Sequence, residues 1–307
     1  MSGSAETAPA GGEAAVGGAD REARRGSRGP RLGVLGWPVA HSRSPAMQNA
    51  ALRELGLGDW IYQRLPVPPE LLEETTRALG AAGFVGANVT IPHKRAALAV
   101  ASEASAAARA IGAANTLTFA RGGGIAAENT DAPGLIAAMR RAGQDPHGRT
   151  ALVLGAGGSA RAAVWALREA GAAEVTVWNR TAARARELAA ALEVRVVLLP
   201  EKADILINCT SVGLVPPASG SESALNLLSL THDLVGRYSY VVDFVYGTNI
   251  TELLAAARER GVPTLDGLEL LVSQGALSLG AWTGQPIAER EDLLEIMRRA
   301  AGEAPVA

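Results

Sequence analysis

A stretch of seven residues carries the side chains that are best placed for chemistry. It reads Asn88-Val89-Thr90-Ile91-Pro92-His93-Lys94, so an apolar strand ends in polar side chains, a proline turns the chain and a lysine follows. Pro92 fixes its own φ and suits the opening of a helix, which would hold Lys94 near the strand end. Strand ends of open α/β sheets are where ligands bind. We predict a site for a polyhydroxylated small molecule here; the alternative is a surface lysine in the first turn of a helix.

A glycine-rich turn follows later in the chain. Gly155-Ala156-Gly157-Gly158-Ser159-Ala160 matches G-x-G-x-x-A directly after an apolar run and before a helical pattern. Glycines allow a tight turn and a close approach of the backbone, and a helix N-terminus offers unpaired N–H groups to a pyrophosphate. We therefore predict that this turn binds a dinucleotide. The alternative is an ordinary turn between a strand and a helix.

The residues after the next strand indicate which dinucleotide binds. An NAD site usually has Asp or Glu at this position, where it accepts a hydrogen bond from the ribose. This chain has Asn179-Arg180-Thr181 instead. A carboxylate would repel a 2′-phosphate, whereas a guanidinium binds one through two parallel hydrogen bonds. The pattern favours NADP(H), with an exposed arginine that merely follows a strand as the alternative.

Three further polar segments could contribute to a site. Ser42 and Ser44 flank a predicted helix start, where a hydroxyl can either cap the helix or help to hold a carboxylate. Asp131 could cap the helix that follows it, or it could orient Lys94 and stabilise its charge. Cys209 has no obvious base partner, so we expect a buried and inert thiol in a loop that lines the nicotinamide.

The composition of the 307 residues excludes several classes of function. The net charge is -2, which leaves no basic surface for nucleic acid or an anionic membrane. No apolar run reaches the roughly 18 residues of a membrane helix. One cysteine and four histidines without ligand spacing argue against a metal site. Residues 1–29 contain almost no large apolar side chain and no secretion signal, so we expect a disordered tail and a cytoplasmic location.

Short apolar runs alternate with helical patterns along the rest of the chain. This alternation predicts an α/β fold of βαβ units with mainly parallel sheets. We expect strands near residues 31–36, 60–65, 86–89, 115–119 and 124–127, and again near 151–154, 174–178, 194–198, 205–208 and 240–244. Among the expected helices are 44–55, 69–81, 132–142, 268–282 and 289–300. The last two helices lack strand partners nearby, so we expect them to return and cover the first part of the chain.

Taken together, the motifs resemble the shikimate dehydrogenase family from about residue 33 to residue 282. Several motifs occur in the right order, and that order is more specific than any one of them. They are the turn with Ser42 and Ser44, residues 88–94, Gly112-Ala113-Ala114-Asn115-Thr116, Asn129-Thr130-Asp131, residues 155–161, 179–181 and 208–213, Val242-Asp243-Phe244-Val245-Tyr246 and Gln274-Gly275-Ala276.

The resemblance implies reversible, NADPH-dependent reduction of 3-dehydroshikimate to shikimate, a step toward the aromatic amino acids. It implies an N-terminal α/β substrate domain completed by C-terminal helices, and a Rossmann-type dinucleotide-binding domain. We place the substrate domain at 30–130 plus 266–302 and the NADP domain at 131–265. The implied catalytic pair is Lys94 and Asp131. The implied substrate-binding residues are Ser42, Ser44, Asn88, Thr90, Asn115, Tyr246 and Gln274.

For cofactor binding we assign the glycine-rich turn, the arginine segment, and residues of two later loops. These residues are Gly155, Ala156, Gly157, Gly158, Ser159, Ala160, Asn179, Arg180, Thr181, Thr210, Ser211 and Gly267. The sequence departs from the family at Leu270, where a methionine is common, and this puts fine specificity in question but not the reaction type. We expect no metal, no nucleic acid and no membrane partner. A homodimer is considered, although the sequence does not determine the oligomeric state.

Alternatives remain at this stage. A quinate/shikimate dehydrogenase of catabolism would need more room near Ser42 and Ser44, and the use of NAD would favour it. An aminoshikimate enzyme is another alternative. A non-catalytic regulator that binds the same ligand should have lost Lys94 or Asp131, and this chain has both.

Overall fold

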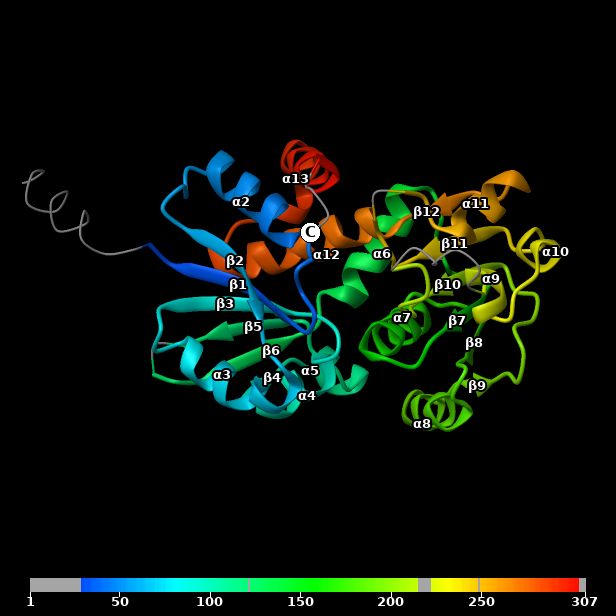
Figure 1. The fold of residues 1–307 in the computed structure, drawn as a ribbon, viewed down its shortest axis with the longest axis horizontal. Helices are drawn as coiled ribbons and strands as arrows, with labels where there is room; N and C mark the ends of the chain where they lie inside the picture. Colours follow the sequence, from blue (N-terminus) through cyan, green and yellow to red (C-terminus); the bar gives the residue numbers. More distant parts are fainter. Residues whose placement is uncertain (1–28, 121, 215–221, 248, 304–307) are drawn as a thin grey trace, which may run out of the picture.

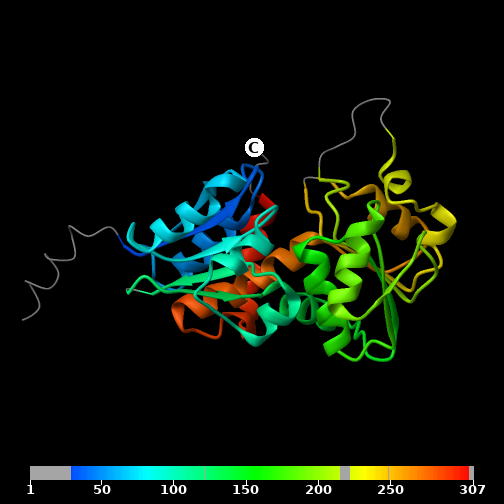
Figure 2. The ribbon, with the colours of Figure 1, turned by 90° about the horizontal axis from the view of Figure 1, so that it is seen from below.

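The computed structural model describes residues 29–120, 122–214, 222–247 and 249–303. In this part of the chain two six-stranded sheets lie side by side, with helices around and between them (Figure 1). Figure 2 shows the two sheets as separate parts of the molecule that are joined in the middle by helices. The tail predicted for residues 1–29 lies almost entirely outside the described residues.

The first sheet contains the strands from the N-terminal part of the chain. They are β1 (Arg31–Gly36), β2 (Ile61–Pro66), β3 (Phe84–Val89), β4 (Glu103–Ala104), β5 (Thr116–Phe119) and β6 (Ile125–Glu128), in the order β2-β1-β3-β5-β6-β4. β1 runs parallel to β2 and to β3. β5 runs antiparallel to β3 and to β6. A short connection without a crossover helix joins β5 to β6, as an antiparallel pair allows.

Short helices connect these strands. They are α2 (Ser44–Glu54), a 3₁₀ turn η1 (Pro69–Leu71), α3 (Leu72–Leu79), α4 (Lys94–Val100) and α5 (Ala106–Ile111). The helix expected at 69–81 is therefore shorter and starts with the 3₁₀ turn. α5 was not predicted, because a helix of six residues has little room for a hydrophobic period. The start of α4 at Lys94 agrees with the position of Pro92.

A second sheet follows the connecting helix α6 (Asp131–Arg141). Its strands are β7 (Thr150–Leu154), β8 (Glu174–Trp178), β9 (Arg195–Val196), β10 (Ile205–Asn208), β11 (Tyr240–Asp243) and β12 (Thr264–Leu265), in the order β12-β11-β10-β7-β8-β9. All neighbouring pairs are parallel. β9 is shorter than the predicted strand at 194–198.

Both faces of the second sheet are covered by helices. They are α7 (Gly158–Glu169), α8 (Ala182–Leu192), α9 (Ala224–Leu227), α10 (His232–Val235) and α11 (Glu252–Glu259). Alternate residues of β7 enter different clusters: Ala151 and Val153 belong to one buried cluster, Leu152 and Leu154 to another. This alternation is the period of a strand that is buried on both faces.

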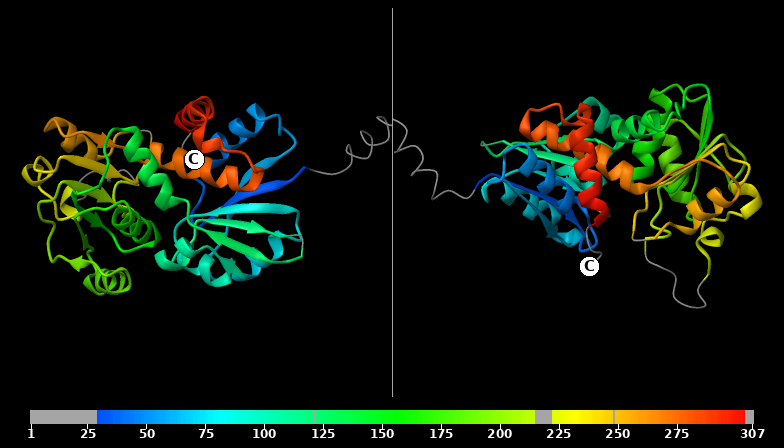
Figure 3. Two further views of the ribbon diagram at one scale, coloured as in Figure 1. Left: turned by 180° about the vertical axis from the view of Figure 1, so that it is seen from behind. Right: turned by 90° about the horizontal axis from the view of Figure 1, so that it is seen from above.

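The C-terminal helices return to the first sheet. They are α12 (Gly267–Thr283), the 3₁₀ turn η2 (Ile287–Glu289) and α13 (Glu291–Glu303). Their buried side chains, among them Leu279, Leu294 and Met297, join Leu32 of β1 and Met47 of α2 in one cluster. Figure 3 shows α13 beside α2, although they come from opposite ends of the chain. The expected completion of the N-terminal part by C-terminal helices is confirmed, while the domain boundaries remain our proposal.

Two classes of feature are not found in the part of the chain that the structure describes. None of its helices is long and apolar enough to cross a membrane. Within the same residues, no group of three or more His, Cys, Asp and Glu side chains could hold a metal ion.

Candidate active site

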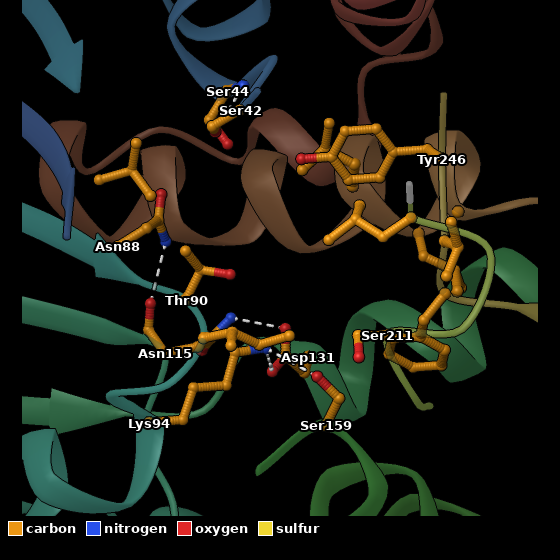
Figure 4. A pocket seen from close by; sticks show the side chains of 18 of the residues that line it. Ser42, Ser44, Asn88, Thr90, Lys94, Asn115, Asp131, Ser159, Ser211 and Tyr246 are labelled. Atoms are coloured by element: carbon orange, nitrogen blue, oxygen red, sulfur yellow. Dashed lines mark hydrogen bonds and ion pairs between the residues drawn. The ribbon is translucent and has the colours of Figure 1, made fainter. Parts of the chain in front are cut away.

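A cavity of about 310 Å³ lies where strand ends of the two sheets face each other. Its walls include residues at or just after the carboxyl ends of β1, β3, β10 and β11, such as Trp37, Thr90, Cys209 and Phe244. All nine residues predicted for catalysis and substrate binding line it, and so do Ser159, Thr210, Ser211 and Gly267. Figure 4 shows Lys94, Asp131 and Ser159 across the cavity from Ser42, Ser44 and Tyr246.

Lys94 and Asp131 form a nearly buried ion pair. The Lys94 Nζ lies 2.6 Å from Asp131 Oδ2, and the two side chains are 11% and 7% exposed. α6 begins at Asp131 itself, so its preceding residue Thr130 occupies the N-cap position, without a side-chain cap bond. Asp131 therefore does not act as the N-cap of α6, and the geometry agrees with the prediction that it orients the lysine.

The turn before Lys94 is anchored on the first sheet. The Thr90 amide donates to the Leu35 carbonyl at 2.8 Å. The buried His93 ring lies with Nε2 2.7 Å from the carbonyl oxygen of Val67. α4 then begins at Lys94, as the position of Pro92 suggested. The backbone that carries Lys94 is therefore held in place on both sides of the turn.

A network of amide side chains lines the wall beside Lys94. Asn115 Nδ2 donates to Asp131 Oδ1 at 2.9 Å and to Gln274 Oε1 at 3.2 Å. Asn88 Nδ2 donates to the Asn115 carbonyl at 3.2 Å, while Asn88 Oδ1 accepts from the Tyr62 hydroxyl at 2.8 Å. A connected network holds polar side chains in fixed orientations. Asn88, Asn115 and Gln274 are therefore held in one connected network, and all three line the cavity.

The opposite wall is formed by the segment before α2. Ser44 is the first residue of α2, and the N-cap position belongs to Arg43, without a side-chain cap bond. The suggestion that Ser44 caps this helix is therefore wrong, because the helix starts one residue earlier than a Ser44 cap requires. The Ser44 amide instead donates to Ser42 Oγ at 3.3 Å. Both hydroxyls line the cavity, and the Ser44 hydroxyl has no capping role.

Electrostatics at this wall suit an anion. Burial raises the pKa of the Tyr246 hydroxyl, and the Ser42 side chain, the Arg43 backbone and the charges of Arg43 and Arg64 oppose that rise. Burial lowers the pKa of His41, and Arg64 lowers it further. Two arginines thus place positive potential beside the hydroxyls, where a carboxylate would be stabilised.

The glycine-rich turn leaves space for a phosphate group. β7 ends at Leu154, Gly155 has φ +112°, and the twelve-residue helix α7 begins at Gly158. A Cβ added at Gly157 would meet nothing within 4 Å, so this backbone is open to a ligand. Together with the unpaired N–H groups of the α7 N-terminus, this space fits the pyrophosphate of a dinucleotide.

The predicted 2′-phosphate site lies at a second hollow. Asn179 and Arg180 line a cavity of about 240 Å³ next to β8, together with the exposed side chains of Leu198 and Leu199. Arg180 itself is exposed. Thr181 occupies the N-cap position of α8 without a side-chain cap bond. These positions fit the adenosine end of NADP(H), with a guanidinium available for the phosphate.

The loops after β10 and β11 complete the main cavity. Asn208 Oδ1 accepts from the Thr210 amide at 3.0 Å and from its hydroxyl at 2.8 Å, which holds the loop that carries Thr210 and Ser211. Cys209 is free and buried, and burial raises the pKa of its thiol well above the usual value. The prediction of an inert thiol is consistent with that shift.

Sequence reasoning missed two supporting residues. Arg64 donates from Nε and Nη2 to the Ser42 carbonyl at 3.0 and 2.7 Å, and so fixes the serine segment. Asp243 is fully buried and accepts from Asn208 Nδ2 at 2.9 Å and from the Val245 amide at 3.0 Å, so it joins the two loops. The position of Asp243 in the Val242–Tyr246 motif was a usable signal. Nothing local in the sequence pointed to Arg64.

Comparisons with known proteins agree with this architecture. The family profile described as "Shikimate dehydrogenase substrate binding domain" matches residues 34–117. The profile described as "Shikimate / quinate 5-dehydrogenase" matches residues 137–269. The two matches fall on the first sheet and on the second.

Individual relatives span nearly the whole chain. A shikimate dehydrogenase (NADP(+)) of Paracoccus denitrificans is 41% identical over 276 residues, covering 86% of this chain and 94% of the relative. The crystal structure of a shikimate dehydrogenase from Aquifex aeolicus has a TM-score of 0.79 at 34% identity, covering 89% of this chain and 98% of that one. A shikimate 5-dehydrogenase from Thermus thermophilus, in complex with NADP(H) and shikimate, has a TM-score of 0.76 at 40% identity, covering 88% and 99%.

Proposed function

Because the chain belongs to the shikimate dehydrogenase family, we propose roles for its residues in the reaction of that family. The protein is an NADP-dependent oxidoreductase that reversibly reduces 3-dehydroshikimate to shikimate, on the route to chorismate and the aromatic amino acids. The observation that carries the residue assignment is the Lys94–Asp131 ion pair, which lies in the wall of the cavity between the two sheets.

We propose that Lys94 is the proton donor in the direction of ketone reduction. NADPH, when bound, supplies the hydride that reduces the carbonyl carbon. The carbonyl oxygen then gains negative charge, and the Lys94 ammonium gives it a proton and becomes a neutral amine. In the reverse direction the neutral amine accepts the hydroxyl proton. Asp131 holds the ammonium by an ion pair at 2.6 Å and stabilises its charged form before the transfer.

We propose that the opposite wall orients the substrate through its carboxylate. The hydroxyls of Ser42, Ser44 and Tyr246 line that wall, and the charges of Arg43 and Arg64 act on it. A carboxylate bound there and a reacting oxygen at Lys94 would fix the substrate at both ends. Orientation of this kind accounts for a large part of the rate of bimolecular reactions in enzymes.

The remaining polar residues of the cavity would recognise the ring hydroxyls. Thr90, Asn115 and Gln274 present hydroxyl and amide groups beside the catalytic pair. Asn88 supports the same wall through its bonds to Tyr62, Asn115 and Thr116. A site whose polar groups expect hydroxyl partners rejects ligands that lack them, because those groups would be left unpaired.

For NADP(H), we propose that the α7 N-terminus binds the pyrophosphate and that Arg180 binds the 2′-phosphate. The open space at Gly157 and the hollow beside Arg180 support this assignment. Thr210, Ser211 and Gly267, which line the main cavity, would face the nicotinamide end.

Steady-state kinetics with shikimate and quinate, each with NADP and with NAD, test the proposal. We expect kcat/KM for shikimate with NADP to exceed that of each other combination by about tenfold or more, which corresponds to about 1.4 kcal/mol. Preference for quinate with NAD would instead support a catabolic quinate/shikimate dehydrogenase. Tight binding of shikimate without turnover would support a regulator and contradict the assignment.

We also propose a cytoplasmic enzyme without a nucleic-acid partner, in line with the net charge of -2. A homodimer is the assembly that we propose to test, by sedimentation equilibrium. Cell fractionation tests the location.

A further inference from the structure

The catalytic lysine has a second acceptor that comes from the other sheet. Lys94 Nζ donates to Ser159 Oγ at 3.0 Å, in addition to its bond with Asp131 Oδ2 at 2.6 Å. Ser159 is the second residue of α7 and belongs to the glycine-rich turn, whereas Lys94 is the first residue of α4. Figure 4 shows the three side chains together at the cavity.

The backbone beneath this bond is also in close contact. A Cβ added at Gly158 would lie 2.6 Å from Lys94 Cβ and 3.1 Å from its Cδ. Only a glycine therefore lets the start of α7 lie against the lysine side chain without displacement. This contact and the hydrogen bond place the cofactor turn and the catalytic lysine in one packed unit.

We propose that Ser159 is a positioning residue for the proton transfer, in addition to its place in the cofactor turn. This proposal rests on the proposed function of Lys94. An ammonium group has three N–H donors. When Asp131 and Ser159 accept two of them, the tetrahedral geometry at Nζ leaves one direction for the third, and this direction is available for the substrate oxygen. Without Ser159 the ammonium can rotate about the Asp131 bond, and fewer encounters are productive.

The same bond relates the lysine to the cofactor. Because Ser159 Oγ accepts from Lys94, its own hydrogen is available to donate, for example to an oxygen of a bound cofactor at the α7 N-terminus. A rival role is a hydroxyl that serves cofactor binding alone. The two roles differ in the quantity that changes when the hydroxyl is removed: turnover in the first case and cofactor affinity in the second.

Kinetics of Ser159→Ala and Ser159→Thr separate these roles. For Ser159→Ala we expect kcat at saturating NADPH to fall about tenfold, a larger effect than the change in the dissociation constant of NADPH measured by fluorescence titration. The isotope effect on kcat with NADPH deuterated at the transferred position should rise, because the chemical step becomes slower. Ser159→Thr keeps the hydroxyl and should recover most of the loss. An unchanged kcat, or a loss confined to NADPH affinity, would overturn the proposal.

A second measurement needs no turnover. The chain has only two lysines, Lys94 and the exposed Lys202, so Lys202→Arg leaves a single side-chain ammonium. In the ligand-free protein labelled with ¹⁵N-lysine, hydrogen exchange of the Lys94 ammonium with water should be several-fold faster after Ser159→Ala. Equal exchange rates would show that the bond does not hold the lysine, and would refute the proposal.

The two experiments also separate failure of this inference from failure of the proposed function. If the Lys202→Arg enzyme did not turn over 3-dehydroshikimate, the proposed function would be wrong, while the exchange rates would still report on the contact between Lys94 and Ser159. If that enzyme were active and Ser159→Ala had the same kcat, only the inference would be wrong. Thermal melting of each variant confirms that it is folded.

Discussion

The Lys94–Asp131 pair makes a double-substitution experiment informative for both catalysis and stability. Lys94→Met keeps an unbranched side chain of similar length but removes the charge and the proton donor. Asp131→Asn keeps the shape but replaces one acceptor oxygen by a donor. In the unsubstituted protein Asp131 Oδ1 accepts from Asn115 and Oδ2 accepts from Lys94. The amide group of Asp131→Asn would therefore have to direct its N–H groups at one of these two donors. Neither single variant can satisfy all the groups that remain.

The magnitudes follow from the burial of the pair. The two side chains are 11% and 7% exposed, so each single substitution leaves an almost buried charge without its partner. Breaking a buried pair from one side costs about 3–5 kcal/mol, and we expect about 3 kcal/mol here because some solvent contact remains. The double variant removes both charges and should be more stable than the sum of the two losses suggests. Loss of general acid catalysis should lower kcat about 10²–10⁴-fold in Lys94→Met.

The assay combines kcat from NADPH absorbance with urea unfolding of all four proteins. If the pair acts as a unit, the double variant should turn over little more slowly than Lys94→Met alone. NADPH affinity should change little, since the cofactor surfaces remain. Near-normal turnover of Lys94→Met would refute the mechanism, and fully multiplicative losses would show that the two residues act independently. Additive losses in stability would show that the ion pair does not couple them in the folded protein.

Three further predictions concern the cofactor turn, the phosphate site and a buried carboxyl. Gly158→Ala should lower the free energy of unfolding by about 1–3 kcal/mol, because its Cβ would overlap the side chain of Lys94. Gly157→Ala should weaken NADPH binding without that loss of stability, because a Cβ there meets nothing within 4 Å. Equal stability of the two variants would contradict this prediction. Arg180→Asp should weaken NADP binding by about 2–4 kcal/mol and NAD binding much less, as measured by titration. Arg186→Asp, on the helix α8 that follows Arg180, serves as a charge-matched control. Burial raises the pKa of Asp243 to about 6, with smaller opposing effects of its hydrogen bonds. The folded state therefore binds more protons than the unfolded state between about pH 4 and pH 6. The free energy of unfolding accordingly falls as the pH rises through this range and the buried Asp243 carboxyl loses its proton. The stability of Asp243→Asn relative to the unsubstituted protein should accordingly rise by about 2 kcal/mol between pH 4 and pH 7. A stability difference that urea unfolding finds constant over this range would exclude the titration.

Local features of the sequence were sufficient to predict much of the site. The turn at 155–160 could be recognised because its glycines, the strand before it and the helix after it are all set within a few residues. Lys94 was placed at a helix start because Pro92 restricts the backbone at that point. We predicted the return of the C-terminal helices because their apolar pattern has no strands nearby in the sequence. Side chains of α12 and α13 lie in the buried cluster that also contains Leu32 of β1.

Helix ends and short elements were less accessible to such reasoning. The choice between capping and ligand binding at Ser44 and Asp131 depended on where the backbone enters the helix, and each helix begins at the residue in question. That difference of one residue is decided by neighbouring contacts, because the local propensities of adjacent start positions are similar.

Only the tertiary structure decided which of these side chains meet. Asp131 lies 37 residues from Lys94 and Ser159 lies 65 residues from it, yet both bond to the same Nζ. Gln274 reaches Asn115 across 159 residues. The sequence determined the chemical character of each strand end, since polar side chains follow apolar runs. Packing determined their partners. Burial of the helices between the two sheets brings the carboxyl ends of their strands together, and no local sequence pattern encodes that arrangement.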